Sequence, residues 1–102
     1  VMGMTLASGG INPLSGQRVL SEHHALMTRA LMATCGLYDG SGEFAVRVGI
    51  PAKSGVGGGI LASVPKKMGL GTFGPALDPK GNSLGGVRLL ERLTQLLDLR
   101  IL

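Results

Sequence analysis

The chain has 102 residues and a mass of 10.4 kDa, which is enough for one ordinary domain and excludes separate cofactor and substrate domains. Hydrophobic residues make up 44% of the chain and charged residues 16%, a balance that excludes intrinsic disorder. The net charge of +4 would suit a nucleic-acid partner, but the basic residues are scattered and there are one Tyr, two Phe and no Trp to stack on bases, so we expect none.

Membrane insertion and secretion are also disfavoured. The longest apolar run lies around residues 56–64, much shorter than the ~20 residues of a membrane-spanning helix, so we expect no membrane partner. Cys35 is the one cysteine, which excludes a disulfide within the chain and favours a reducing compartment. We therefore expect a cytoplasmic protein if the source is bacterial and a mitochondrial one if it is eukaryotic, with Cys35 as a small buried hydrophobe.

The chain opens on an apolar stretch, residues 1–7, which stops at Ser8-Gly9-Gly10. This pattern predicts a helix closed by glycine, and the stretch has neither the charged start of a signal peptide nor an initiator Met. We expect the 102 residues to form a single unit that is the downstream part of a longer domain. The turn-forming residues at 11–16 then predict a loop.

A second helix is predicted between Ser21, a candidate N-cap, and Gly36, a candidate C-cap. Apolar residues recur between them at helical spacing, which predicts an amphipathic helix of about three to four turns. These residues are Ala25, Leu26, Met27, Ala30, Leu31 and Met32.

Three strands are predicted in the middle of the chain. Residues 43–48 alternate, with Phe44, Val46 and Val48 on one face, which is typical of a half-buried strand. The apolar runs at 57–64 and 68–73 are separated by Pro65-Lys66-Lys67 and predict an antiparallel pair. The sheet should therefore be antiparallel and contain at least three strands.

A final helix is predicted from Asn82 or Ser83 onward. Its apolar residues face one way and its charged and polar residues the other, so the helix needs a sheet or another helix to cover it. The apolar set is Val87, Leu90, Leu93 and Leu97. The fold class predicted from the elements is α+β, an antiparallel sheet flanked by helices.

Several short motifs imitate known sites but lack their context. Residues 57–62 match a permissive dinucleotide pattern that leads into a strand, without the helix N-terminus that holds pyrophosphate. Residues 52–54 resemble the end of a P-loop without its glycines, and Pro65 interrupts the Ser-x-x-Lys of residues 63–66. His23-His24 lies in a helical first turn without further ligands at metal spacing, so we expect no metal and no cofactor.

Lys53-Ser54-Gly55 is a more informative motif. A basic residue, a hydroxyl and a glycine open a predicted apolar strand, and the further glycines there let another molecule approach the backbone closely. In penicillin-recognising serine enzymes a Lys-Thr/Ser-Gly strand flanks the substrate opposite a Ser-x-x-Lys helix. By itself this motif permits a penicillin-recognising hydrolase or transpeptidase.

Longer stretches of the sequence closely resemble the serine-dependent glutaminases of the β-lactamase-like fold. The resemblance covers nearly the whole chain and is carried by residues 34–45, TCGLYDGSGEFA, and 48–60, VGIPAKSGVGGGI. It extends to residues 6–13, LASGGINP, and 77–83, LDPKGNS. These enzymes are considerably longer, and this sequence resembles their C-terminal part.

The resemblance implies the C-terminal part of a β-lactamase/transpeptidase-like fold and hydrolysis of L-glutamine to L-glutamate and ammonia through a seryl acyl-enzyme. It implies that Tyr38 contacts the nucleophile and the substrate and relays a proton, and that the backbone N–H of Val56 helps to hold the oxyanion. The nucleophilic serine and its lysine would belong to upstream sequence, so the 102 residues alone should be inactive. We further expect a homo-oligomer without a cofactor.

Two alternatives stay open from the residues alone. One is the penicillin-recognising hydrolase or transpeptidase that the Lys53 motif permits, although the Tyr38 segment does not suggest it. The other is a small basic interaction domain without enzymatic activity, in which Tyr38 merely closes a turn and Lys53 is a solvated charge at the end of a strand.

Overall fold

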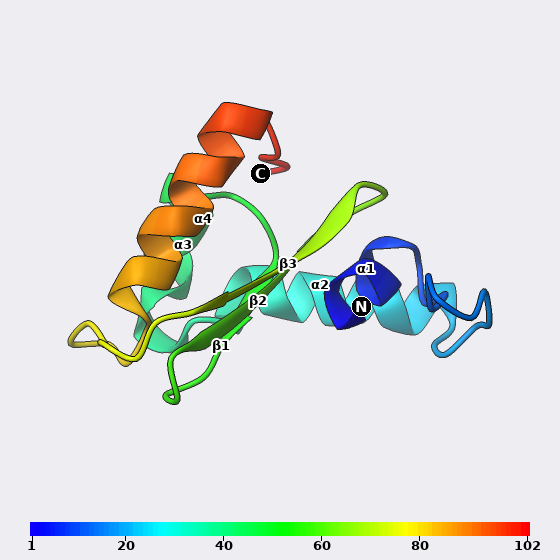
Figure 1. Ribbon diagram of the computed structural model, residues 1–102, viewed down its shortest axis with the longest axis horizontal. Coiled ribbons are helices and arrows are strands. Elements are labelled where there is room, and N and C mark those ends of the chain that lie inside the picture. The colour runs from blue at the N-terminus through cyan, green and yellow to red at the C-terminus, as the bar shows by residue number, and fades with distance from the viewer.

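The computed structural model describes residues 1–102 as helices on both sides of a small sheet (Figure 1). The predicted α+β class and the antiparallel three-stranded sheet are confirmed. In chain order the elements are α1 (Met2–Ala7), α2 (Glu22–Cys35), the short 3-10 helix η1 (Tyr38–Gly40), α3 (Ser41–Arg47), β1 (Ala52–Ser54), β2 (Gly59–Val64), β3 (Met68–Phe73) and α4 (Leu84–Leu97).

The sheet has the order β1-β2-β3, and both neighbouring pairs are antiparallel hairpins. Along β2 and β3 the register runs from Gly59 opposite Phe73 to Val64 opposite Met68, which confirms the predicted pair. The turn between them places Lys66 at a φ of +66°, a left-handed conformation that tight hairpin turns require.

The strand predicted at residues 43–48 is wrong, because this segment forms the helix α3. Phe44 and Val48 are buried as predicted, but Val46 is 73% exposed. Residues four apart share a face in a helix as well as in a strand, so Phe44 and Val48 fit both periods. Gly49, at a φ of +76°, lies just beyond the end of the helix, and the third strand is β1 instead.

The main core lies on one face of the sheet. Side chains of β2 that point to this face, Ile60, Ala62 and Val64, belong to the same buried cluster as Phe44 of α3 and Leu90 of α4. Figure 1 shows α4 and α3 next to each other, on the side of the sheet away from α1. The alternation of buried residues along β2 follows from the two-residue period of a strand, which sends every second side chain to this core.

The opposite face of the sheet is covered by α1, which approaches it very closely. The Ser63 hydroxyl donates a hydrogen bond to the carbonyl oxygen of Gly3, at 2.9 Å. A Cβ atom added at Gly69 would lie 2.3 Å from the backbone nitrogen of Met4. Gly3 of α1 and Gly69 of β3 meet at this contact. The helix and the strand can pack this closely because neither residue has a side chain.

The C-terminal end of α2 contacts β1 in a similar way. The carbonyl oxygen of Gly36 accepts a hydrogen bond from the backbone N–H of Ser54, at 3.0 Å. A Cβ atom on Gly36 would lie 1.8 Å from the carbonyl oxygen of Ala52. This contact covers the free edge of β1 and fixes where the chain continues after α2.

The predicted limits of α2 and the predicted start of α4 are confirmed. Ser21 and Ser83 are the N-caps, and their hydroxyl oxygens accept hydrogen bonds from the backbone N–H groups of His24, at 3.1 Å, and Gly86, at 3.0 Å. Gly36 follows the last residue of α2 as predicted. In α4, Leu90 is buried but Leu97 is 53% exposed, so the predicted apolar side of this helix is covered only in part. No helix has the length and apolar character needed to cross a membrane.

The apolar side of α2 is only partly covered. Ala25 and Met32 are buried, whereas Leu26, Met27 and Leu31 are half exposed or more. The expected burial of Cys35 is wrong: its thiol is exposed on this side of the helix and donates to the carbonyl oxygen of Leu31, at 3.1 Å. Within residues 1–102, the side chains of Leu26, Met27, Leu31 and Cys35 therefore stay largely uncovered.

We expect a polypeptide of these 102 residues alone to aggregate or to show molten character. Each large apolar side chain that stays in water forgoes about 1.5–3 kcal/mol of burial free energy, and α2 exposes three. Circular dichroism during heating and size-exclusion chromatography would measure this. Cooperative unfolding of a soluble monomer would contradict it.

We expect Gly36→Ala to destabilise the full-length protein by at least the ~1–3 kcal/mol that overpacking costs, because the added methyl group meets backbone that cannot turn away. Gly42→Ala is a matched control, because a Cβ at that position meets no atom within 4 Å. The measurement is the melting temperature of both variants. Equal melting temperatures would show that β1 can move away from α2.

Candidate functional site

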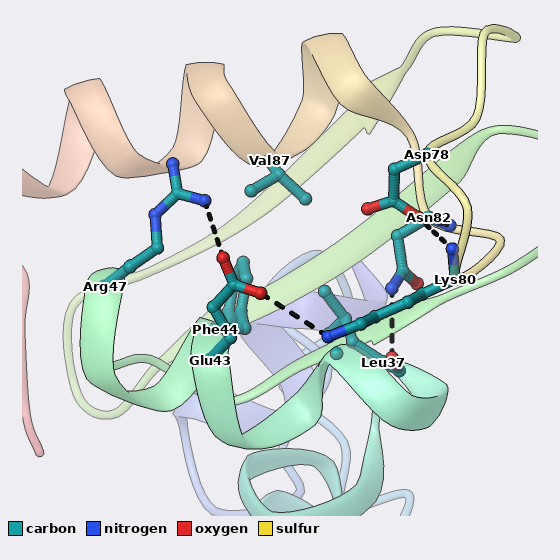
Figure 2. A pocket seen from close by; sticks show the side chains of 9 residues that line it. Leu37, Glu43, Phe44, Arg47, Asp78, Lys80, Asn82 and Val87 are labelled. Carbon is teal, nitrogen blue, oxygen red and sulfur yellow. Dashed lines mark hydrogen bonds and ion pairs between the residues drawn. The ribbon is translucent and has the colours of Figure 1, made fainter.

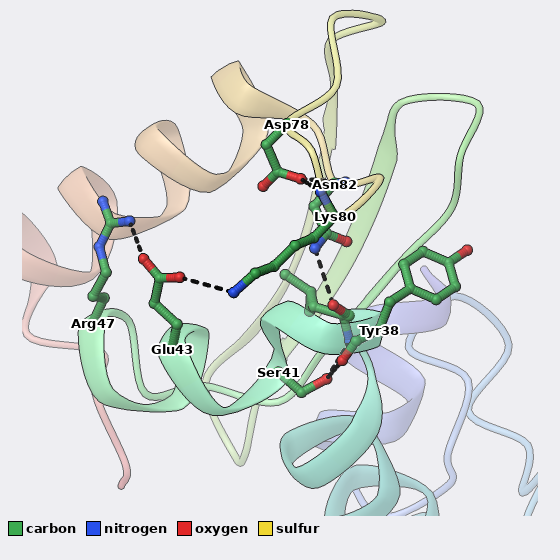
Figure 3. Close-up of polar contacts among 8 residues, drawn as sticks. Tyr38, Ser41, Glu43, Arg47, Asp78, Lys80 and Asn82 are labelled. Carbon is green, nitrogen blue, oxygen red and sulfur yellow. Dashed lines mark hydrogen bonds and ion pairs between the residues drawn. The ribbon is translucent and has the colours of Figure 1, made fainter.

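Tyr38 lies between α2 and α3 and adopts a left-handed backbone conformation, with a φ of +51°. Such a conformation costs a non-glycine residue on the order of 1–3 kcal/mol and persists where neighbouring contacts enforce it. Ser41 supplies two of these contacts. Its hydroxyl donates to the carbonyl oxygen of Tyr38, at 2.8 Å, and accepts from the N–H of Leu37, at 2.9 Å (Figure 3).

The Tyr38 side chain projects from this segment and is 46% exposed. Its hydroxyl makes no hydrogen bond within the chain. The ammonium group of Lys53, from β1, lies 4.7 Å from the centre of the ring, a cation–π contact, and also donates to the carbonyl oxygen of Ser54. The ring is therefore held by a neighbouring cation while the hydroxyl stays free for an external group.

Val56 lies in the turn between β1 and β2. The N–H of Gly58 donates to the carbonyl oxygen of Gly55, at 3.0 Å, and the N–H of Gly55 donates to the carbonyl oxygen of Gly59, also at 3.0 Å. The N–H of Val56 has no partner in the chain, and its side chain is exposed. Residues 53–59 therefore do not open a single strand, as the sequence suggested, but turn from one strand into the next.

Gly81 brings Tyr38 and Val56 together. A Cβ atom at Gly81 would lie 3.7 Å from Cγ1 of Val56 and 3.9 Å from Cδ2 of the Tyr38 ring. The φ of Gly81 is +88°, so the loop before α4 can pass between the two residues without a side chain. Two residues 18 positions apart in the sequence thus border the same point of the surface.

Asn82 is a buried polar residue beside this point whose role the sequence did not reveal. Its side-chain amide donates to the carbonyl oxygen of Leu37, at 3.0 Å (Figure 2). Its amide oxygen accepts from the Ser54 hydroxyl, at 2.5 Å. The residue is 2% exposed. The Asp78 carboxylate holds the loop by accepting from the N–H groups of Lys80 and Asn82. The sequence offered Asn82 only as a possible helix start.

A row of charged side chains extends from Lys80, next to Asn82, along α3 (Figure 2). Arg47 forms ion pairs with Glu91, at 2.8 Å, and with Glu43, at 3.2 Å, and the Lys80 ammonium lies 3.6 Å from Glu43. Hydrogen bonds to Glu91 and then to Glu43 raise the pKa of the Arg47 guanidinium. Because these charges pair with each other, they join α3, α4 and the 78–82 loop.

The other motifs of the sequence do not form sites. The Ser63 hydroxyl is buried against Gly3, so it is not paired with Lys66. His23 and His24 are exposed, and no group of three or more His, Cys, Asp or Glu side chains lies where it could hold a metal ion. Tyr38 and Val56 are thus the two predicted residues that the structure brings together.

The comparisons with known proteins point to one family. The family model described as Glutaminase matches residues 1–102. A glutaminase of Clostridium tetani is 59% identical over 96 residues, which are 94% of this chain and 31% of that protein. A glutaminase of Clostridium botulinum is 53% identical over 100 residues, 98% of this chain and 33% of that protein. The chain therefore spans about a third of the length of these relatives.

Solved structures agree with this assignment and confirm the expected β-lactamase-like fold. A probable glutaminase from Bacillus subtilis complexed with 6-diazo-5-oxo-L-norleucine superposes with a TM-score of 0.94 at 44% identity, covering 99% of this chain and 35% of that one. A covalent complex of a Bacillus subtilis glutaminase with 5-oxo-L-norleucine gives 0.95, with 99% and 37% covered. Because the family model matches residues 1–102 and relatives are more than half identical, the chain belongs to the glutaminase family.

Proposed function

We propose that the full-length protein that carries this chain hydrolyses L-glutamine to L-glutamate and ammonia through a seryl acyl-enzyme. The family supports the reaction. The observation that carries the proposal is local: the Tyr38 ring and the Val56 side chain border one point of the surface, at Gly81, and neither the Tyr38 hydroxyl nor the Val56 N–H has a hydrogen-bond partner within the chain. A related glutaminase binds 5-oxo-L-norleucine covalently, which supports a nucleophilic mechanism.

The chemistry requires three things of the site. A serine oxygen attacks the side-chain amide carbon of glutamine and loses its proton, and the carbonyl oxygen becomes an oxyanion. The tetrahedral intermediate then expels ammonia, which needs a proton on the nitrogen. Water hydrolyses the remaining ester and releases glutamate and the serine. The site must supply a proton relay and a donor for the oxyanion.

This chain supplies a candidate for each of these two parts. The Tyr38 hydroxyl, free of hydrogen bonds within the chain, can accept the serine proton and deliver it to the departing nitrogen. The N–H of Val56 can donate to the oxyanion, and the absence of an internal partner leaves it available for this. Lys53 contributes by holding the face of the Tyr38 ring.

The remaining machinery is assigned to the part of the protein outside these residues. The nucleophilic serine, its lysine and the groups that bind the charged end of glutamine would come from there, so a polypeptide of residues 1–102 should not hydrolyse glutamine. We further propose that the enzyme is a homo-oligomer and that it acts in the cytoplasm of a bacterium.

Turnover by the full-length protein tests this function directly. We expect release of ammonia and glutamate from glutamine, and covalent labelling by 6-diazo-5-oxo-L-norleucine. Hydrolysis of a penicillin without glutamine turnover would favour the penicillin-recognising alternative. Neither activity, with binding of another protein, would favour the interaction domain.

We expect Tyr38→Phe in the full-length protein to lower glutamine turnover by about 10²–10⁴-fold, the usual contribution of a proton-transfer group. Stability should barely change, because the hydroxyl has no partner in the chain and the ring keeps its contact with Lys53. Ser15→Ala removes a hydroxyl in an exposed loop and is the control, with turnover unchanged. Near-normal turnover of the Phe variant would assign Tyr38 to packing.

Val56 allows a separate test of a backbone donor. Val56→Ala keeps the N–H and should preserve most activity, whereas Val56→Pro deletes it and should lower turnover by at least the ~10²–10³-fold of a lost oxyanion donor. Val56 is the second residue of a four-residue turn, a position where proline is well tolerated.

The comparison is made between folded variants, with melting temperature and circular dichroism measured beside turnover. Retained turnover in a natively folded proline variant would exclude the oxyanion role. An alanine variant as impaired as the proline variant would assign the effect to the valyl side chain.

A further inference from the structure

The backbone around Tyr38 depends on a hydrogen-bonded link that reaches it from another part of the chain. Tyr38 has a left-handed φ of +51°, so the orientation of the preceding peptide group must be enforced. The carbonyl oxygen of that peptide belongs to Leu37. It accepts two hydrogen bonds, from the N–H of Gly40, at 2.9 Å, and from the side-chain amide of Asn82, at 3.0 Å.

The first of these bonds lies within the short helix η1 and moves with it, but the second comes from the loop before α4. Asn82 is itself fixed on three sides. Its amide oxygen accepts from the hydroxyl of Ser54 in β1, and its backbone N–H and carbonyl oxygen bond to Asp78. The Tyr38 segment is thereby tied to β1, the strand that ends at the Val56 turn.

Asn82 has little freedom to move away from this position. The residue is buried, and a Cβ atom at Gly40 would lie 2.9 Å from its amide nitrogen. Loss of the amide would leave the Leu37 carbonyl oxygen and the Ser54 hydroxyl without these partners in a buried place. The peptide before Tyr38 could then rotate, and the ring would leave its place beside Gly81.

We propose that Asn82 is a positioning residue for the Tyr38 hydroxyl: through Leu37 it fixes the peptide before Tyr38, and through Ser54 it anchors that peptide to β1. The inference rests on the proposed function and goes beyond it, because Asn82 touches neither the phenol nor the Val56 N–H. Its effect on the reaction passes through Tyr38.

The test is a double-mutant cycle in the full-length protein with glutamine as substrate. Asn82→Ala should lower kcat by about 10- to 100-fold, the cost of a misplaced catalytic group, with KM changed less than about threefold. In the Tyr38→Phe background the same substitution should change kcat less than about threefold, because the hydroxyl that it positions is already absent.

Two further variants keep the result decisive. Asn82→Asp keeps the shape but replaces the donor to Leu37 by an oxygen, so its loss of kcat should match that of Asn82→Ala. Asn12→Ala removes an asparagine whose side chain accepts a hydrogen bond in the 11–18 loop, and should leave kcat unchanged. If the Asn82 variants do not fold, Ser54→Ala, which removes the anchor to β1, enters the same cycle with the same expected pattern.

An equal loss of kcat in the parent and in the Tyr38→Phe background would overturn the inference, since a merely structural role is additive. Unchanged kcat in a folded Asn82→Ala variant would also overturn it. In both cases an active parent leaves the proposed function intact. A parent without glutamine turnover overturns both.

Discussion

The contact between Gly36 and β1 is the constraint on which the site depends. A helix backbone normally keeps its distance from a strand because side chains lie between them, but Gly36 has none and its carbonyl oxygen bonds directly to the N–H of Ser54. The chain leaves α2 at the edge of the sheet, and two residues later Tyr38 stands beside Lys53. A larger residue at 36 would displace α2, and with it Tyr38.

A second constraint acts from the other side. The 78–82 loop places Gly81 between Tyr38 and Val56 and buries Asn82. The side-chain amide of Asn82 donates to the carbonyl oxygen of Leu37 and accepts from the hydroxyl of Ser54. Ion pairs of Glu43 with Lys80 and of Arg47 with Glu91 add little energy, because they are exposed, but they join the same elements. Three segments that are distant in the sequence therefore fix the conformation of the short stretch of backbone around Tyr38.

The arrangement separates two kinds of chemical group. The side chain of Tyr38 and the backbone of Val56 face outward without internal partners, whereas the polar groups that hold them, on Ser41, Ser54 and Asn82, are buried and hydrogen bonded. The proposed reaction would need this arrangement, with the reacting groups free for the substrate and their supports rigid. The exposed apolar side of α2 adjoins this arrangement, because Leu31 and Cys35 line the same surface pocket as Lys53.

Local signals in the sequence determined much of this protein. Ser21, Gly36 and Ser83 marked the ends of α2 and the start of α4 because capping uses groups within one turn of the helix. The break at Pro65 separated β2 from β3, and the motifs around Tyr38 and Lys53 indicated the family.

The tertiary structure decided the rest. Phe44 and Val48 fit a strand and a helix equally, and only packing on the core selected the helix α3. Three further features depend on which distant segments lie side by side: the exposure of Cys35, the meeting of Tyr38 with Val56 at Gly81, and the link through Asn82. The periodicity of the sequence contains no information about these long-range contacts.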